Sequence, residues 1–371
     1  MAELQQTKNS FKFIGKATRL DKDGAFKEEE AKRGKREGDT YRSLRFGVKT
    51  SENNEMTVSM YDFEPTEVFM WNSEKRKKDQ SYKGDRIPFE EWLEKKDELR
   101  EQGYAVLQTR VGLNYDEKGK LKSHGLPSFV ASEEIYNALN NGDPVVIEGE
   151  IRYSTYENQQ GNEVEQKTFT IKKIFRLKDV DFESDKFEEI TYFEQEFVFI
   201  DAVAEKDENK VYVTGRVIDY SKNFHDTTFV VDYSDGNGGK DKGMLKLAES
   251  IMKKIKFGDV LTVFGEALNR VIVEEVEEDE EEEDFSILGG KTKPSHAQSY
   301  TAKTYISEMQ IHGIDDWVKK VYVEEDFDKD ELMEEDNSLQ NELGGKKKDK
   351  GANPFDNDED DDDISDEDLP F

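Results

Sequence analysis

Two short segments of the sequence place aromatic and basic side chains where they could contact a ligand. Residues 41–49 and 56–63 both alternate apolar side chains with rings, cations and small polar groups. Because side chains alternate between the two faces of a strand, antiparallel strands joined by the hairpin-sized turn 50–55 would bury the apolar set. The opposite face would carry Tyr41, Arg45, Lys49, Tyr61 and Phe63. Aromatic rings stack on unpaired bases without reading them, and Arg or Lys side chains contact phosphates.

Further cations and rings are second-rank candidates for the same contacts. In the first half of the chain they are Lys12, Lys16, Arg19, Arg42, Arg110 and Arg152. In the second half, the outward parity of 211–220 and the loop after it select Tyr212, Arg216, Tyr220 and Phe224. The alternative for any single ring is a place in the core or beneath an inserted segment. The basic run 75–78, beside Trp71 and Tyr82, could contact phosphate or form a solvated loop.

The sequence offers little for catalysis. Its four histidines, at 124, 225, 296 and 312, have no metal-ligand spacing. Segment 235–240 hints at a calcium loop but lacks the glycine at the sixth position and the glutamate at the twelfth. Segment 289–292 imitates a phosphate-binding loop, but Phe285 stands where the first glycine is required. We therefore expect no enzyme activity, no metal site and no cofactor, although abundant carboxylates leave a metal-dependent nuclease as an open alternative.

The last nineteen residues, 353–371, join an acidic run to an apolar end and read NPFDNDEDDDDISDEDLPF. Repulsion between like charges and the lack of apolar surface predict a disordered tail. Its tip is suited to a partner's pocket, because Pro370 restricts the backbone, the Phe371 ring is apolar, and the α-carboxylate can pair with a guanidinium. The residues expected to contact partners are Ile364, Asp366, Glu367, Asp368, Leu369, Pro370 and Phe371.

This tail resembles the C-terminal tip of bacterial single-stranded DNA-binding proteins, which closes an acidic segment on Asp, Ile or Leu, Pro and Phe. The upstream Asn-Pro-Phe at 353–355 and the closing DISDEDLPF at 363–371 are similar to the Gram-positive form. The resemblance covers only the tail. It implies sequence-independent binding and protection of single-stranded DNA during replication, recombination and repair. It also implies that replication, recombination and repair proteins dock on the tip.

The resemblance has limits that bear on origin and assembly. Cellular members of that family usually carry one OB-fold in a shorter chain, so this chain resembles a phage or mobile-element version that borrows the host's recruitment peptide. Two barrels in one chain could replace a dimer, which puts the tetramer typical of the family in doubt. The oligomeric state is left open.

The net charge of −32 is unevenly distributed along the 371 residues. Residues 1–178 contain 32 Lys and Arg against 32 Asp and Glu, residues 179–320 contain 17 against 33, and residues 321–371 contain 5 against 21. A basic face therefore stays possible in the first half. The absence of cysteine suits a reducing compartment, and no apolar run approaches the roughly 20 residues of a membrane span. We expect a cytoplasmic protein, in the host cytoplasm if phage-encoded, with no membrane partner.

The predicted elements are mainly strands with short helices, and their order repeats. The first half is expected to contain strand 11–20, a charged loop 21–39, the hairpin 41–63, a hairpin within 104–130, a helix 133–141 capped by Ser132, and strands 142–150 and 168–175. The second half is expected to contain strand 211–220, which resembles the first strand 11–20, then strand 227–233, a helix 244–256, and strands 258–266 and 300–311. A Gly-Asp pair precedes a Gly-Glu pair by seven residues in both 142–150 and 258–266, which lie 116 residues apart.

This order predicts two OB-folds, five-stranded Greek-key barrels whose second and third strands carry the ligand face. The expected domains are 1–180, with a helical insertion at 64–103; 181–320, with an acidic loop at 274–298; and the disordered tail 321–371. The acidic tail could compete with DNA for the chain's own basic groove. The rival hypothesis is an acidic DNA mimic that binds host DNA-processing enzymes without binding DNA.

Overall fold

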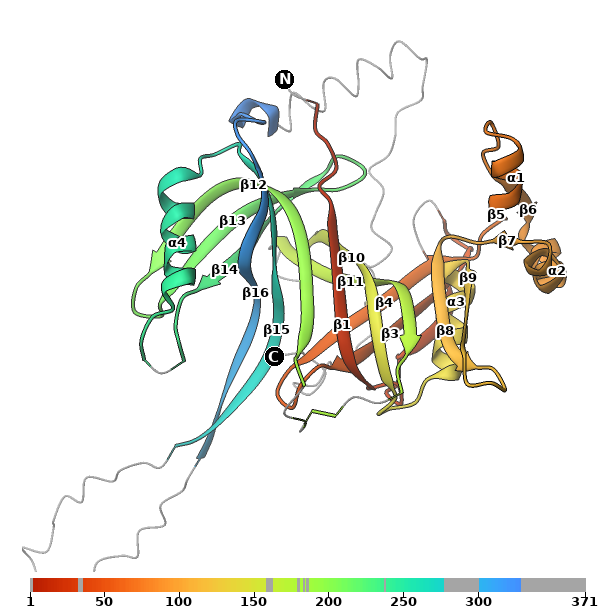
Figure 1. Ribbon diagram of the computed structural model, residues 1–371, viewed down its shortest axis with the longest axis horizontal. Helices are drawn as coiled ribbons and strands as arrows, with labels where there is room; N and C mark the ends of the chain where they lie inside the picture. The colour runs from red at the N-terminus through yellow and green to blue at the C-terminus, as the bar shows by residue number, and fades with distance from the viewer. Residues whose placement is uncertain are drawn as a thin grey trace, which may run out of the picture.

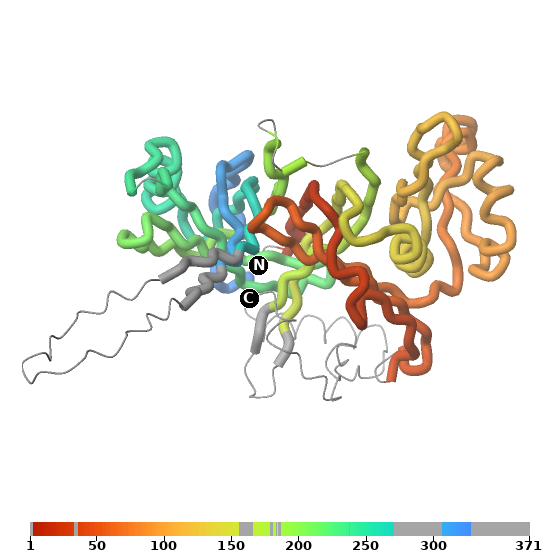
Figure 2. The backbone as a smooth tube through the Cα atoms, turned by 90° about the horizontal axis from the view of Figure 1, so that it is seen from below, coloured from red at the N-terminus to blue at the C-terminus, as the bar shows by residue number. Residues whose placement is uncertain are grey.

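The computed structural model of the chain describes residues 3–32, 36–157, 163–178, 181–182, 184, 187–236, 238–276 and 300–327. Within this part the fold is mainly β, with four α-helices and one short 3-10 helix. The predicted acidic loop 274–298 lies outside the described residues from 277 onward, and the predicted tail lies outside them from 328 onward. Figures 1 and 2 show the second half of the chain at one end of the molecule and the helical insertion at the other.

Five strands of the first half pair in a closed ring, the first ring. Its members are β1 (Asn9–Thr18), β3 (Thr40–Lys49), β4 (Glu55–Phe63), β10 (Pro144–Glu157) and β11 (Glu163–Arg176). Around the ring β1 pairs with β3, β3 with β4, β4 with β11, β11 with β10 and β10 with β1; only the β4–β11 pairing is parallel. Helix α3 (Ser128–Ala138) lies in sequence between β4 and β10.

The same order recurs in the second half and forms the second ring. Its members are β12 (Ile190–Glu205), β13 (Lys210–Ile218), β14 (Phe224–Asp232), β15 (Val260–Val276) and β16 (Tyr300–Val318). The pairings run β12–β13, β13–β14, β14–β16, β16–β15 and β15–β12, and again only the third-to-fifth pairing, β14–β16, is parallel. Helix α4 (Lys242–Lys254) lies between the third and fourth strands.

The remaining strands and helices are attached to the outside of the first ring. Strand β2 (Phe26–Glu30) pairs with Thr40–Leu44 of β3, beyond the part of β3 that pairs with β1. Strands β8 (Thr109–Tyr115) and β9 (Leu121–Leu126) form a hairpin beside β11. The insertion contains β5 (Glu67–Asn72), α1 (Ser73–Lys78), β6 (Asp85–Pro88), α2 (Phe89–Glu101) and β7 (Tyr104–Ala105). Its three strands form a separate small sheet in the order β6-β5-β7.

Alternation fills the interior of each ring with apolar side chains. Along β1, Phe11, Phe13, Gly15 and Ala17 are buried, while Lys12, Ile14 and Lys16 between them are half-exposed. Phe11, Phe13 and Phe169 form a ring cluster with centroids 4.6–5.2 Å apart. In the second ring Phe197 stacks on Phe229 at 4.7 Å. Aromatic pairs at such distances add to the stabilisation from area burial.

The two rings are joined by their first strands and by a polar joint. β1 and β12 pair antiparallel over Asn9–Ile14 and Ile190–Gln195, so the sheet is continuous between the rings. At the joint, Asn269 of β15 donates its backbone N–H to Asn54 Oδ1 and its amide to the Glu55 carbonyl, at 2.7 and 2.9 Å. The hairpin between β3 and β4 therefore rests on the second ring.

Several predicted elements were wrong. The charged loop 21–39 contains strand β2, and strand β12 was missed. Segment 211–220 corresponds to β13, the second strand of its ring, not the first. The helix begins at Ser128, five residues before the predicted start, because Ser132 does not cap it: its hydroxyl donates to the Phe129 carbonyl at 2.8 Å within the helix. Serine often bonds back to the preceding turn in this way.

Residues 321–327, which fall within the predicted tail, are folded. Val321 and Tyr322 donate their backbone N–H groups to the Gly258 carbonyl, and a 3-10 helix follows at Glu324–Phe327. Tyr322 and Phe327 are buried with Leu4, Val198 and Ile218 in a small apolar cluster. The last described residues therefore pack beside the middle of β12 and the end of β13.

Candidate nucleic-acid interface

The outer face of β3 and β4 carries the predicted rings and cations in adjacent rows. Residues opposite each other on neighbouring strands share a face, and the pairing is Tyr41 with Phe63, Ser43 with Tyr61, and Arg45 with Ser59. At the far end of the same face, Lys49 lies opposite Glu55. Leu44, Phe46, Val48, Met56, Val58 and Met60 fill the buried face, as predicted. The alternation thus places Tyr41, Arg45, Lys49, Tyr61 and Phe63 on one surface.

Three rings gather at one end of this surface. Tyr41, Tyr61 and Phe63 lie with centroids 5.1, 5.5 and 5.9 Å apart, and all three are half-exposed. The Arg36 guanidinium lies 4.0 Å from the centre of the Phe63 ring. Burial against these neighbours raises the pKa of Tyr61 to about 12, so the hydroxyl stays neutral at physiological pH. We call Tyr41, Tyr61, Phe63 and Arg36 the aromatic end.

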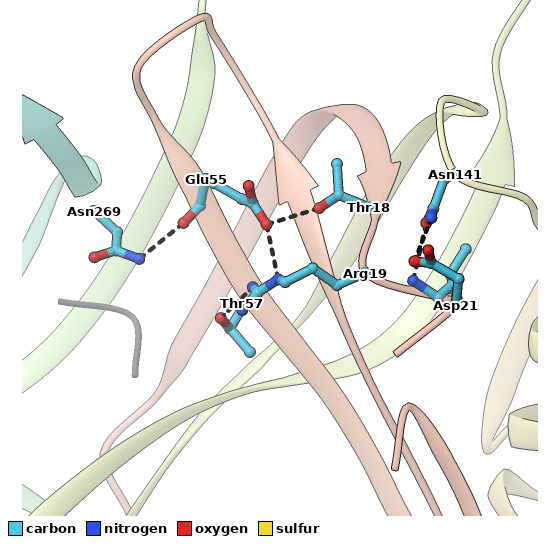
Figure 3. A network of polar contacts seen from close by, with 8 residues as sticks. Thr18, Arg19, Asp21, Glu55, Thr57, Asn141 and Asn269 are labelled. Atoms are coloured by element: carbon cyan, nitrogen blue, oxygen red, sulfur yellow. Dashed lines mark hydrogen bonds and ion pairs between the residues drawn. The ribbon is translucent and has the colours of Figure 1, made fainter. Parts of the chain in front are cut away.

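Two arginines lie toward the other end of the surface. Arg19 Nε pairs with Glu55 Oε1 at 2.8 Å and its Nη2 donates to Thr57 Oγ1 at 2.8 Å, while Thr18 Oγ1 donates to the same carboxylate at 2.7 Å (Figure 3). The next residue but one, Asp21, is held by Asn141 (Figure 3). Arg19 is therefore a fixed, neutralised cation, and it occupies a left-handed backbone conformation with φ of 61°.

Arg45 differs from Arg19. Its side chain is exposed to solvent, and its guanidinium has no ion pair or hydrogen bond within the described residues. Partial desolvation and the nearby charge of Arg19 lower the pKa of Arg45. Both influences disfavour a cation. A bound anion would oppose both influences, so a phosphate would pair favourably with Arg45.

Neighbouring strands extend the same surface. Lys27 of β2 lies opposite Ser43 and is exposed, which places a cation in the same row as Tyr61. Lys49 pairs in register with Lys16 of β1, and Lys16 Nζ lies 4.8 Å from the Phe182 ring. Lys27 and Arg36 were not among the predicted residues. Both fall in a segment that looks like a charged loop, and only their spatial neighbours distinguish them.

Four of the second-rank candidates are engaged elsewhere. Arg42 is held between Glu28 and Glu133 at 2.6 and 3.0 Å and stacks on Phe129, so it anchors α3 and does not line the outer face. Lys12 pairs with Glu148 at 3.5 Å and Arg152 with Glu150 at 2.8 Å. Arg110 donates to Ser123 on the hairpin β8–β9. Arg42 is therefore a correction to the prediction, because its parity matches the buried residues of β3.

The corresponding face of the second ring is neutralised by its own carboxylates. Arg216 makes a bidentate pair with Asp226 at 2.6 and 2.7 Å, and Lys210 Nζ pairs with Glu308 at 2.5 Å. Tyr212 donates to Glu208 at 2.6 Å, and this hydrogen bond, with burial, raises its pKa to about 12. The predicted residues Tyr212 and Arg216 lie on one face, but the face offers little net positive charge.

The folded segment after β16 also covers part of that face. Phe327 stacks edge-on against Phe224 at 5.4 Å and lies 4.8 Å from the Arg216 guanidinium. A cavity of about 460 Å³ beside them is lined by Arg216, Phe257, Glu324, Glu325 and Phe327. Of the four predicted residues of the second ring, only Tyr220 is fully open to solvent, at 87% exposure.

A family model matches residues 84–345 of the chain, and its description is YorF. The match spans well over half of the 371 residues. The chain belongs to the YorF family. No curated protein matches the sequence of this YorF-family chain.

Two solved structures of the single-stranded DNA binding protein from Thermus aquaticus are similar to this chain in shape. The wild-type structure is 12% identical, covers 71% of this chain and 87% of its own, and superposes with a TM-score of 0.32. A deletion mutant of the same protein is 11% identical, covers 72% and 89%, and also has a TM-score of 0.32. An overlap this low assigns neither a fold nor a ligand to the YorF-family chain.

Other predicted features concern absent sites and the tail. Among the described residues, no group of three or more His, Cys, Asp or Glu is arranged to hold a metal ion. None of the described helices has the length and apolar character needed to cross a bilayer. The predicted partner-binding residues Ile364, Asp366, Glu367, Asp368, Leu369, Pro370 and Phe371 lie outside the described residues.

Proposed function

We propose that this chain binds single-stranded DNA without sequence preference, through the outer face of β3 and β4. The observation that carries the proposal is Arg45, an exposed guanidinium without a described partner, beside Arg19 and on the same face as the aromatic end. Stacking of an unpaired base on a ring contributes about 1–3 kcal/mol, and it requires no particular base. Half-exposed rings at one end and an unpaired cation toward the other suit a strand lying along the sheet.

The proposal includes an OB-fold for each ring. Both rings pair their strands in the order first, second, third, fifth, fourth and back to the first, with a helix between the third and fourth strands. That order and helix position support a five-stranded Greek-key barrel, whose ligand face lies on the second and third strands. In the first ring these strands are β3 and β4. Their outer face carries the aromatic side chains and the cations.

The proposal extends to biological role through the tail. A binding protein without catalytic activity would protect single strands during replication, recombination and repair, while the tip, Leu369-Pro370-Phe371, recruits other proteins. The support for this part is the sequence of the tip and its resemblance to bacterial single-stranded DNA-binding proteins. The departure from the single OB-fold of the cellular family supports a phage or mobile-element origin, and the lack of cysteine supports a cytoplasmic location.

The test is a titration of fluorescently labelled oligothymidine and of a matched duplex at two salt concentrations. We expect the single strand to bind far more tightly, with log affinity falling by about 0.7 per phosphate contact for each unit of log salt. Arg45→Glu should weaken single-strand binding about ten-fold or more and reduce the salt slope. The matched control is Lys246→Glu, which makes the same charge change on the exposed face of α4 in the second ring.

Two results would contradict the proposal. Equal binding by Arg45→Glu and Lys246→Glu would remove the β3–β4 face from the interface. Failure of the unaltered chain to bind either single strand or duplex would favour the rival function, an acidic mimic of DNA, which the negative second half of the chain supports.

A further inference from the structure

The insertion carries a second surface of rings and cations that the β3–β4 face does not include. Strand β5 buries Val68 and Met70 against α2, where Phe89 and Trp92 are also buried. The alternate residues, Phe69 and Trp71, lie on the other face of the small sheet. Phe69 is 40% exposed, in a module whose core is already filled by other apolar side chains.

The rings on this second face are held in place by the loop that follows α1. Tyr82 lies 5.4 Å from Trp71, centroid to centroid, and its hydroxyl donates to Asp85 at 3.1 Å. Arg76 donates to the carbonyls of Gln80 and Tyr82, which fixes the loop. Gly84 has φ of 99° and lies against the Phe69 ring, where a Cβ atom would come within 2.3 Å. These contacts fix the positions of Phe69, Trp71 and Tyr82 relative to one another.

Lys75 lies beside the Tyr82 ring, and Lys78 and Lys83 are its neighbours in the sequence. Lys75 Nζ lies 4.9 Å from the Tyr104 ring and 5.8 Å from the Tyr82 ring, and pairs with Asp85 at 2.9 Å. Lys78 and Lys83 have no ion pair within the described part of the chain, and both are exposed. The segment 64–88 contains six Lys and Arg against five Asp and Glu, whereas α2 contains three against six. The segment that carries the rings is therefore less acidic than α2.

The second surface lies close to the aromatic end of the first. Strand β4 ends at Phe63, and the six residues from there to Phe69 span at most about 20 Å. Gln108, which follows the insertion, donates to Asp62 at 2.8 Å, and Phe89 packs edge-on against Phe129 of α3 at 6.1 Å. These contacts hold the insertion against the first ring (Figure 1).

We propose that this face of the insertion, formed by Phe69, Trp71, Tyr82, Lys78 and Lys83, binds single-stranded nucleic acid and continues the track that begins at the aromatic end. The rings accept bases and the two unpaired lysines accept phosphates, which is the combination that single strands require. The inference rests on the function proposed above and adds a second contact region to it. A strand long enough to reach both surfaces should bind more tightly than one that covers the β3–β4 face alone.

The test is a length series of labelled oligothymidines, titrated against the full chain at low salt. For the unaltered chain, affinity should keep rising after the β3–β4 face is filled. Phe69→Ala should lower the affinity of long oligonucleotides about five-fold or more, the lower end of the stacking range, and leave the shortest unchanged. The matched control is Leu93→Ala on α2, because Leu93 is 41% exposed in the same module.

A charge variant tests the phosphate contacts independently of packing. Lys78→Glu with Lys83→Glu should reduce the salt slope for long oligonucleotides by about 1.4, corresponding to two contacts. Lys95→Glu with Lys96→Glu, the same charge change on α2, should leave the slope unchanged. The inference is overturned if both surface variants bind every length as their controls do while Arg45→Glu still weakens binding. If the unaltered chain binds no single strand, the proposed function fails as well, and the two failures are distinguishable.

Discussion

Phe11 and Phe193 lie directly opposite each other where β1 pairs with β12. On its other side, each of them pairs with the glycine of a Gly-Glu dipeptide: Phe11 with Gly149 of β10, and Phe193 with Gly265 of β15. The pairing is therefore the same when the first and second strand rings are exchanged, so a local two-fold axis passes between Phe11 and Phe193. The 116-residue spacing from Gly149 to Gly265 in the sequence reflects this symmetry.

The two glycines are expected to be necessary for closing the rings. A Cβ atom on Gly149 would lie 1.9 Å from the Thr170 carbonyl oxygen, and one on Gly265 would lie 1.8 Å from that of Gln310. Gly149→Ala and Gly265→Ala should each lower the free energy of unfolding by about 1–3 kcal/mol, as overpacking does. Chemical denaturation measures this. Gly243→Ala in α4 is the control and should be neutral or stabilising, because alanine favours helix.

The strands that could be predicted from the sequence are those whose buried face is uniformly apolar. β3 and β4 are of this kind. β12 was missed because Thr191 and Gln195 are fully buried on its inner face, which breaks the alternation. Gln195 is tolerated there because it accepts a hydrogen bond from Tyr153 of β10 at 3.0 Å and donates to the Glu196 carbonyl. No local pattern reveals such a partner.

The candidate site was predicted in part for a related reason. Parity along β3 and β4 is a local property, so it identified the outer face. Whether a cation on that face is available depends on carboxylates brought from elsewhere: Glu133 lies 91 positions from Arg42 in the chain. Phe327, more than a hundred residues from Arg216, covers that side chain only in the folded chain. Sequence reasoning placed Arg216 on the outer face and Arg42 wrongly beside the groove, and it could not say that either was already paired.

The contrast between Arg216 and Arg45 predicts opposite effects of the same substitution. Arg216→Ala should lower the free energy of unfolding by about 1–3 kcal/mol, because Asp226 loses a bidentate partner and Phe327 loses its cation. Single-strand affinity should change less than two-fold. Arg45→Ala should weaken single-strand binding and leave stability unchanged or slightly raised, since repulsion from Arg19 is relieved. Thermal denaturation and anisotropy titration on both variants decide this, and an affinity loss confined to Arg216→Ala would refute it.

Lys167 of β11 predicts a pH dependence of stability. It lies opposite Tyr153 in the β10–β11 pairing, and burial lowers its pKa from 10.5 to about 8. Between pH 8 and pH 10.5 the unfolded chain holds this proton and the folded chain does not, so stability should rise with pH across that window. Below pH 8 Lys167 is charged in both the folded and the unfolded chain, so the folded state bears the full cost of burying the charge. Lys167→Met should therefore raise the free energy of unfolding at pH 7, by on the order of 1–2 kcal/mol after allowance for partial exposure.

The measurement for Lys167 is denaturant unfolding at pH 7, 9 and 10. The difference between Lys167→Met and the unaltered chain should shrink as pH rises, because the penalty disappears once the folded lysine is neutral. Lys167→Arg is the matched control: it keeps the cation and should be no more stable than the unaltered chain at any of these values. A difference that stays constant with pH would assign the effect to packing alone.

The joint between the rings predicts a last effect, carried by Glu189. Its carboxylate accepts hydrogen bonds from Thr50 Oγ1 and Asn54 Nδ2, both at 2.7 Å, and pairs with Arg270 at 2.9 Å. Asn54 is buried, at 1% exposure, so removing the acceptor leaves its amide nitrogen unsatisfied away from water, whereas the Thr50 hydroxyl keeps the Asn54 carbonyl as an acceptor. Glu189→Ala should lower the free energy of unfolding by about 1–3 kcal/mol. Its neighbour Glu188 is exposed, so Glu188→Ala should have no effect in the same thermal denaturation assay; equal melting temperatures for the two variants would show that the joint does not stabilise the fold.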